Sequence, residues 1–386
     1  MNTKIGSSFL LIAAIVAFAA IAPAVLMTAP AVAAQLSYEL YLRPEQIGYL
    51  FSTELGALSL ATVPAYWWLK KIDWRLAAFI AGVALCLGNL GSMFVHTYSD
   101  LLMARAFSSF AGGSLMIICV SSAALTQNPS RIYGVWVMGQ LVLGAIGLAV
   151  LPKVYANFGL AGGYAGLALI GLLILPLCKA FPPQRPITPQ ENLARNASSK
   201  GRIALAISGL LGFYISLSAV WTFIGSVAAE AELDGQSVTS ILSVATVMGI
   251  VGAALAAMIG ERVRREVLLC TGFGMMFVAI VVLLDLPNLT RFAVAAMLFK
   301  FTWTYVLPSI LACLADLDES GQTMNTCNLV IGAGLAIGPA IAGRLIEQTG
   351  SFVPVLTGAA VITALSVLPI LISRHKREPK ISTNPL

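Results

Sequence analysis

Three strongly charged residues lie well inside apolar stretches of this 386-residue chain: Glu54, Arg105 and Lys300. An ionised side chain in the interior of a bilayer is costly, so such residues usually face a water-filled cavity or a partner of opposite charge. Glu54 can bind and release a proton, whereas a guanidinium such as that of Arg105 keeps its proton. The three residue types therefore predict ion pairing, proton transfer or the binding of an anion.

Arg105 requires an anion, backbone carbonyl groups or water around it, and Glu54 is the obvious anion. One interpretation makes Arg105 a structural tie between helices or a side chain that reaches the membrane interface; the other gives it a role in substrate binding or proton coupling. Glu54 has two matching interpretations, a permanent counter-ion or a proton carrier. Both interpretations stay open, because burial raises the pKa of a carboxyl group whereas a nearby arginine lowers it.

Lys300 lies in the aromatic stretch "LFKFTWTY" (298–305). Trp303 follows three residues later, on the same face of a helix, so a cation–π contact is expected. Lys300 would attract an anionic substrate if it faces a central cavity. The alternative is an ion pair with Glu54 across the molecule.

Neutral side chains add further candidates for substrate binding. Tyr214 and Trp221 are seven residues apart and share a helix face. For these aromatics, helix packing or anchoring at the membrane interface is an equal alternative. Gln140 is expected to line a cavity, because an amide that faces lipid is costly. The remaining candidates are Trp303, Asn325 and Asn328.

Long apolar segments must position these residues. The chain is 58% hydrophobic and 10% charged, whereas a soluble protein carries about 25% charged residues. Each segment is close to the roughly 20 residues that cross a bilayer as a helix. The sequence therefore predicts an all-α membrane protein with twelve spans: 8–29, 46–67, 75–95, 100–124, 132–152, 160–180, 203–226, 237–259, 267–284, 289–312, 323–345 and 351–372.

Basic residues alternate between the two sets of loops. The loops and termini that would share one side hold 17 of the 23 Lys and Arg residues, and the opposite loops hold four, Arg43, Lys153, Arg291 and Arg344. Cytoplasmic loops retain positive charge, so both termini are predicted to be cytoplasmic. The segment "ADLDESGQ" (315–322) is an acidic exception. The basic composition thus reflects topology and does not predict binding of nucleic acid.

The chain divides into two similar halves. The polar stretch 181–202 is predicted to be a cytoplasmic linker between six-helix bundles at 1–180 and 203–386. "ANFGLAGGYAGLALIGLLILP" (156–176) and "EQTGSFVPVLTGAAVITALSVLP" (347–369) share a polar turn with glycine and a terminal Leu-Pro. Arg105 and Lys300 are 195 positions apart and occupy nearly matching places. Such duplication is typical of secondary transporters, whose substrate site lies between the repeats.

These features resemble the major facilitator superfamily (MFS). "RAFSSFAGG" (105–113) resembles its span-four motif, and "GLAIGPAIAG" (334–343) carries a Gly-Pro pair. "AYWWLKKIDWR" (65–75) and its repeat "AMIGERVRRE" (257–266) resemble the loop that latches neighbouring helices at the cytoplasmic face, although Leu69 replaces the expected aspartate. The resemblance implies a gating role for seven loop residues: Lys70, Lys71, Asp73, Arg75, Glu261, Arg262 and Arg265.

The resemblance implies a secondary transporter that works by alternating access on a small-molecule substrate in a lipid bilayer. Proton coupling would rest on Glu54 and Arg105, and the net positive site favours an anionic or zwitterionic organic metabolite or drug, moved by export. The alternatives are a proton-coupled importer of an organic anion and, more distantly, a membrane sensor. No enzyme activity, metal or other cofactor is expected beyond a proton or other ion gradient, because the chain has no phosphate-binding loop or cysteine–histidine cluster. A monomer in a bacterial inner membrane is expected.

Overall fold

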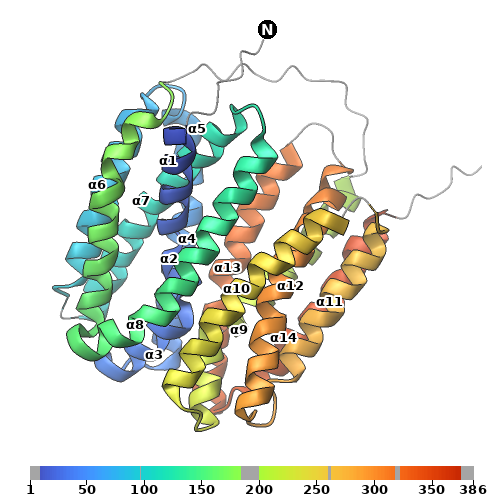
Figure 1. Cartoon of the computed structure of the whole chain (residues 1–386). Coiled ribbons are helices and arrows are strands. Elements are labelled where there is room, and N and C mark those ends of the chain that lie inside the picture. The colour runs from blue at the N-terminus through green and yellow to red at the C-terminus, as the bar shows by residue number, and fades with distance from the viewer. Residues whose placement is uncertain (1–8, 96, 184–199, 260–261, 318–321, 375–386) are drawn as a thin grey trace, which may run out of the picture.

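The computed structural model describes residues 9–95, 97–183, 200–259, 262–317 and 322–374, and these residues form helices joined by short connections (Figure 1). The helices of the first half lie on one side of the molecule and those of the second half on the other, as the blue-to-green and yellow-to-red ribbons show. The elements are α1 (Phe9–Ile21), α2 (Ala24–Met27), α3 (Ala29–Leu40), α4 (Pro44–Leu60), α5 (Thr62–Trp68), α6 (Trp74–Ser92), α7 (Tyr98–Ala124), α8 (Pro129–Ile174), the 3-10 helix η1 (Leu175–Ala180), α9 (Lys200–Glu230), α10 (Gly235–Ile259), α11 (Arg265–Val281), α12 (Leu289–Ala315), α13 (Gln322–Thr349) and α14 (Val353–Arg374).

The predicted all-α membrane architecture is confirmed, and each of the twelve apolar segments lies on helix. Among the described residues, eight helices are long and apolar enough to cross a membrane, and one of them, residues 131–180, contains two predicted spans. The other three predicted spans fall on the broken runs α1–α3 and α4–α5 and on α11, which has 17 residues. A connection at 282–288 divides α11 from α12, as the sequence suggested at 285–291.

The first span is longer and more bent than predicted. The expected segment 8–29 continues as helix to Leu40, with breaks between α1, α2 and α3. Pro23 and Pro30 each stand at the beginning of the helix that follows a break, where a missing backbone N–H is tolerated. The first span therefore consists of three short helices in series, of which α2 packs against α8, and α3 packs against α8 and α9.

A single residue separates the fifth and sixth spans. The helical segment α8 runs through the expected loop 153–159 and turns at Gly159, which has φ 61° and ψ −166°. Gly350, at the matching place before α14, also has a positive φ of 66°. L-residues with a Cβ rarely adopt this region. The two similar segments noted in the sequence thus turn at equivalent glycines.

The two halves repeat the same helix pairings. Within the first half α4 packs against α7, and α6 packs against α7 and α8. Within the second half α10 packs against α12, and α11 packs against α12 and α14, which are the equivalent spans. This repetition places α7, with Arg105, and α12, with Lys300, at corresponding positions. The predicted linker 181–202 lies mostly outside the described residues.

The halves meet along three helix pairs, α4 with α13, α8 with α10 and α3 with α9. The α4–α13 contact is the tightest, because Gly48 and Gly343 bring the two backbones together. A Cβ on Gly48 would overlap the carbonyl oxygen of Pro339, and a Cβ on Gly343 would overlap that of Pro44. Arg43 and Glu347 form an ion pair of 3.3 Å across the same contact.

We expect Gly48→Ala to destabilise this closed arrangement by about 1–3 kcal/mol, the usual cost of forcing an extra carbon into a packed interface. Gly56 on the same helix is the matched control, since its added Cβ would sit 3.8 Å from Ala336 Cβ in ordinary contact. Thermal unfolding of the purified variants would measure the difference. Equal melting temperatures for Gly48→Ala and Gly56→Ala would contradict the close contact.

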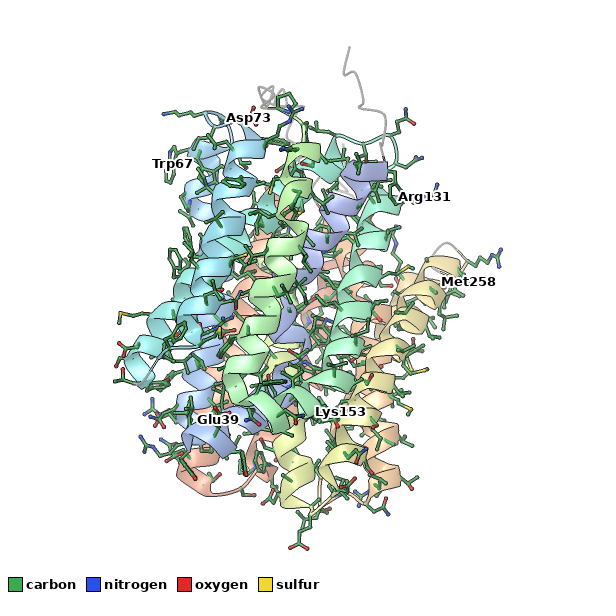
Figure 2. All side chains as sticks on the ribbon, turned by 60° about the vertical axis from the view of Figure 1, so that its left-hand side comes forward. Glu39, Trp67, Asp73, Arg131, Lys153 and Met258 are labelled. Carbon is green, nitrogen blue, oxygen red and sulfur yellow. The ribbon has the colours of Figure 1, made fainter. Side chains whose placement is uncertain are left out.

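The connections lie at two opposite ends of the molecule. Figure 2 places Trp67, Asp73 and Arg131 toward one end and Glu39 and Lys153 toward the other. Successive loops thus lie at alternate ends of the molecule, as twelve membrane crossings require. The loops that the sequence predicts to be basic lie at the end that carries Asp73 and Arg131. The assignment of that end to the cytoplasm stays a prediction.

Candidate functional site

Glu54 and Arg105 form a buried ion pair between α4 and α7. Arg105 Nε donates to Glu54 Oε1 at 2.5 Å, and the two side chains are 3% and 5% exposed. A buried charge needs both a counter-ion and hydrogen bonds to remain in place. The expected contact between these residues is therefore present, and it neutralises both charges within the first half.

Two residues without a predicted role, Asn89 and Tyr164, complete the surroundings of this pair. Arg105 Nη1 donates to Asn89 Oδ1 on α6 at 2.8 Å, while Asn89 Nδ2 donates to the carbonyl of Leu85 at 3.0 Å. The guanidinium carbon lies 4.8 Å from the centre of the Tyr164 ring on α8. Asn89 is an isolated amide in an apolar span, which is the signal that could have identified it.

A small cavity of about 20 Å³ borders the ion pair. Its polar side consists of Glu54, Asn89, Arg105, Ser108 and Ser109, and its other side includes the bend of the first span, 21–26. A cavity of this volume holds about one water molecule. Ser108 Oγ is buried and has no hydrogen-bond partner among the described residues, so a water molecule here would satisfy it and lie beside the carboxylate.

Lys300 lies in the second half without an anion. Its side chain is 1% exposed, and Nζ has no hydrogen-bond partner among the described residues. Nζ lies 3.7 Å from the centre of the Trp221 ring and 4.1 Å from that of the Trp303 ring. The expected contact with Trp303 is therefore present. The alternative pairing of Lys300 with Glu54 is wrong, because Glu54 is committed to Arg105.

The surroundings of Lys300 stabilise a cation only in part. A cation held against an indole face in a water-free site gains about 2 kcal/mol, whereas burying an ammonium without an anion costs several kcal/mol. The two indole contacts therefore offset a fraction of the cost. The interior of the described protein has one paired and one unpaired cation, and the unpaired one is surrounded by rings.

Trp221 also links the two halves. Its indole N–H on α9 donates to the carbonyl of Leu26 on α2 at 2.9 Å. In a continuous helix this carbonyl would accept from residue 30, but residue 30 is a proline and has no N–H. The break in the first span thus presents an acceptor that a side chain from the other half satisfies.

Gln140 satisfies the other proline-freed carbonyl of the first span. Its Nε2 on α8 donates to the carbonyl of Ala19 at 2.9 Å, and residue 23, which would normally donate there, is a proline. The sequence predicts that Gln140 lines a cavity. The structure instead gives its amide a structural contact with the backbone of α1, for the same reason that an unsatisfied amide would be costly.

We expect Gln140→Leu to lower the free energy of unfolding by about 1–3 kcal/mol, because the buried carbonyl of Ala19 loses this donor. Gln140→Glu would place a carboxylate oxygen against the carbonyl oxygen of Ala19, two acceptors, and should lower the free energy of unfolding by at least as much. Gln236→Leu, on an exposed side chain in the first turn of α10, is the control and should change stability little. The check is thermal unfolding, and wild-type stability in Gln140→Leu would show that the bond contributes nothing.

The other predicted substrate-binding residues differ in their distance from this site. Tyr214 is buried on α9, 2% exposed, and shares a side-chain hydrogen bond with Trp303. Asn328 is exposed on α13. The side chain of Asn325 lies outside the described residues. The structure therefore brings together Lys300, Trp221, Trp303 and Tyr214. It does not add the exposed Asn328 to them.

The predicted gating residues make local contacts at one end of the bundle. Asp73 accepts from the backbone N–H of Arg75 at 2.7 Å and caps α6, and Arg75 Nε donates to the carbonyl of Phe181 at 2.8 Å. Arg265 on α11 pairs with Asp316 at the end of α12, which gives one acidic residue of segment 315–322 a counter-ion. Lys70, Lys71 and Arg262 are exposed, and Glu261 lies outside the described residues.

A larger groove of about 250 Å³ lies between α5, α6 and α7. Its lining is apolar apart from Ser114 and contains none of the predicted site residues. Trp68, Ile80, Phe107 and Phe110 are among the side chains that form it. The groove lacks the polar groups that fix an organic ion.

Comparison with known proteins agrees with this architecture. The family model described as Major Facilitator Superfamily matches residues 7–317 and, in a second match, 206–385. The fold is similar to the crystal structure of the nucleoside transporter NupG, with a TM-score of 0.74 and 12% identity over 95% of this chain and 100% of that one. It is also similar to a bacterial homologue of the human lysosomal transporter Spinster in an inward-facing, unoccupied conformation, with a TM-score of 0.67 and 12% identity over 95% and 96% of the two chains.

Proposed function

Because the chain belongs to the Major Facilitator Superfamily of secondary transporters, we propose that it moves a small organic anion or zwitterion across the membrane by alternating access. The substrate would bind between the two halves, near Lys300. Proton movement through Glu54 would drive export of the substrate. The remaining alternative is import of an organic anion together with protons.

The observation that carries this proposal is the unpaired ammonium of Lys300. It is buried, it has no hydrogen-bond partner among the described residues, and two indole rings flank it. Arg105 is paired with Glu54, so Lys300 is the buried cation without an anion among the described residues. An anionic group on a substrate would neutralise that charge.

Glu54 is the proposed proton carrier. Its carboxylate is held by Arg105 and borders a cavity that has room for about one water molecule. Protonation would weaken the charge-assisted bond to Arg105 and free the guanidinium to change partners. The ion pair would thereby connect proton binding to the packing of α4 against α7.

Rocking of the halves would use the three helix pairs between them. At one end α4 and α13 are in backbone contact and are tied by Arg43 and Glu347. In the predicted orientation this end faces outward, so the outer entrance is closed. Opening it requires the exposed Arg43–Glu347 pair and the glycine contacts to separate, and exposed ion pairs of this kind cost little to break.

Flux measurements in proteoliposomes would test the proposal. Vesicles loaded with a panel of radiolabelled organic anions would be placed under an imposed pH gradient. Antiport predicts substrate movement opposite to the proton flow, whereas import with protons predicts movement in the same direction. Glu54→Gln should abolish gradient-driven movement while substrate exchange at equal pH continues.

The matched control is Glu230→Gln, an exposed carboxylate at the end of α9, which should retain gradient-driven flux. A rise in driven export in Glu54→Gln would contradict the antiport mechanism. Failure of every anion to move, with uncharged solutes moving instead, would contradict the choice of substrate class.

A further inference from the structure

Three aromatic rings lie together around Lys300, although only two of them contact its ammonium group. Trp221 is stacked on Phe299 with ring centres 6.2 Å apart and an interplanar angle of 12°. Trp221 and Trp303 meet edge to face at 6.3 Å and 72°. Trp221 and Phe299 are fully buried, and Trp303 is 8% exposed. The ammonium therefore lies in a corner between two aromatic planes that are fixed by their neighbours.

The corner combines a charge and flat apolar surfaces within a few ångströms. A ligand whose anionic group reaches Lys300 Nζ must place the atoms next to that group against the indoles, because Nζ is 3.7 Å and 4.1 Å from the two ring centres. Aromatic rings stack on or meet the edges of indoles with a preference beyond the area that they bury. A saturated hydrocarbon group in the same place would gain only the free energy of burying its apolar surface.

The first half offers no comparable surface. Arg105 faces the single ring of Tyr164 at 4.8 Å, its charge is neutralised by Glu54, and it also donates to Asn89. Both halves thus carry an intramembrane cation at corresponding positions, but the rings and the unused charge coincide only in the second half. The difference between the halves indicates which cation meets the ligand.

We propose that the substrate is a small monoanion whose charged group is attached to a planar aromatic ring. The inference rests on the proposed function and narrows its substrate class. The ammonium of Lys300 binds the anionic group, and the ring of the substrate packs against the faces of Trp221 and Trp303. In the structure the ammonium itself occupies the aromatic corner.

Equilibrium binding of radiolabelled benzoate and 2-naphthoate to the purified protein would test the inference. The competitors are cyclohexanecarboxylate, which has the same charge and a similar size without a π-face, and benzamide, which has the ring without the charge. Benzoate should bind up to about tenfold more tightly than cyclohexanecarboxylate. Benzamide should compete poorly. Trp303→Leu should remove the preference for the aromatic acid, and Trp303→Phe should restore part of it, so that a folding defect can be told apart from loss of a ring.

Trp67→Leu, at an exposed tryptophan, is the control and should keep the preference. Equal binding of benzoate and cyclohexanecarboxylate, or no binding of either aromatic acid, would overturn the inference. Transport of an aliphatic anion that depends on Lys300 would overturn the aromatic preference and leave the proposed function standing. Flux of all anions at wild-type rates in Lys300→Met would instead overturn the proposed function.

Discussion

Lys300→Met is expected to reduce transport by about 10- to 100-fold, the effect of losing one charge-assisted bond to the substrate. The same change should leave the protein as stable as the wild type or more stable. Methionine fills a similar volume between Trp221 and Trp303, and it removes a buried ammonium that has no anion. Replacing buried ionic groups by apolar ones is often neutral or stabilising.

The combination of lost transport and retained stability distinguishes a ligand-binding lysine from a structural one. Flux in proteoliposomes and thermal unfolding in detergent would be measured on the same preparations. Lys153→Met is the matched control, because Lys153 is an exposed lysine labelled in Figure 2, whereas Lys300 is buried. A strongly destabilised Lys300→Met protein would show that the ammonium supports the fold.

Arg105→Gln is expected to lower the free energy of unfolding by about 3–5 kcal/mol. The substitution leaves the carboxylate of Glu54 buried without its cation, which is the costly way to break a buried pair. The double variant Glu54→Gln/Arg105→Gln should recover much of this loss, because two neutral amides can hydrogen-bond to each other and to Asn89. Transport driven by a pH gradient should be lost in both proteins.

A double-mutant cycle on thermal unfolding would measure this coupling. The exposed pair Arg43–Glu347, with side chains 62% and 26% exposed, serves as the reference. Its cycle should give a coupling of about 0–1 kcal/mol. Similar coupling energies for the two pairs would mean that Glu54 and Arg105 are hydrated in the membrane-embedded protein.

The helices were predictable because a bilayer imposes a length and a composition on each span. The end of the first span was not, since hydropathy reports where the bilayer ends and not where the helix ends. The polar segment "QLSYEL" (35–40) is still helix, and most of it is exposed. The bend at Pro23 and Pro30 was visible in the residue types, but the partners of the freed carbonyls come from α8 and α9, which no local pattern identifies.

The charged part of the site was also predictable in part. A buried arginine demands an anion, which led to Glu54, and helical spacing placed Trp303 beside Lys300. Asn89 and Trp221 reach the cations from other helices, so their contacts depend on how each helix is rotated about its axis. That rotation follows from packing between helices. For Gln140, the prediction that its amide needs a hydrogen-bond partner was correct. The partner, however, is the backbone carbonyl of Ala19 on α1 and not a group in a cavity.

The bend in the first span also has an evolutionary consequence. A proline at position 30 and an indole donor at position 221 form one unit, as do a proline at 23 and an amide at 140, because each proline leaves an acceptor that the other residue covers. Loss of the Trp221 or Gln140 side chain alone would leave a backbone carbonyl without a donor. Replacement of the proline first would restore a backbone N–H to that carbonyl, and the distant side chain would no longer be needed. We therefore expect each pair to covary among relatives, with the proline changing before its distant donor along any lineage that loses both.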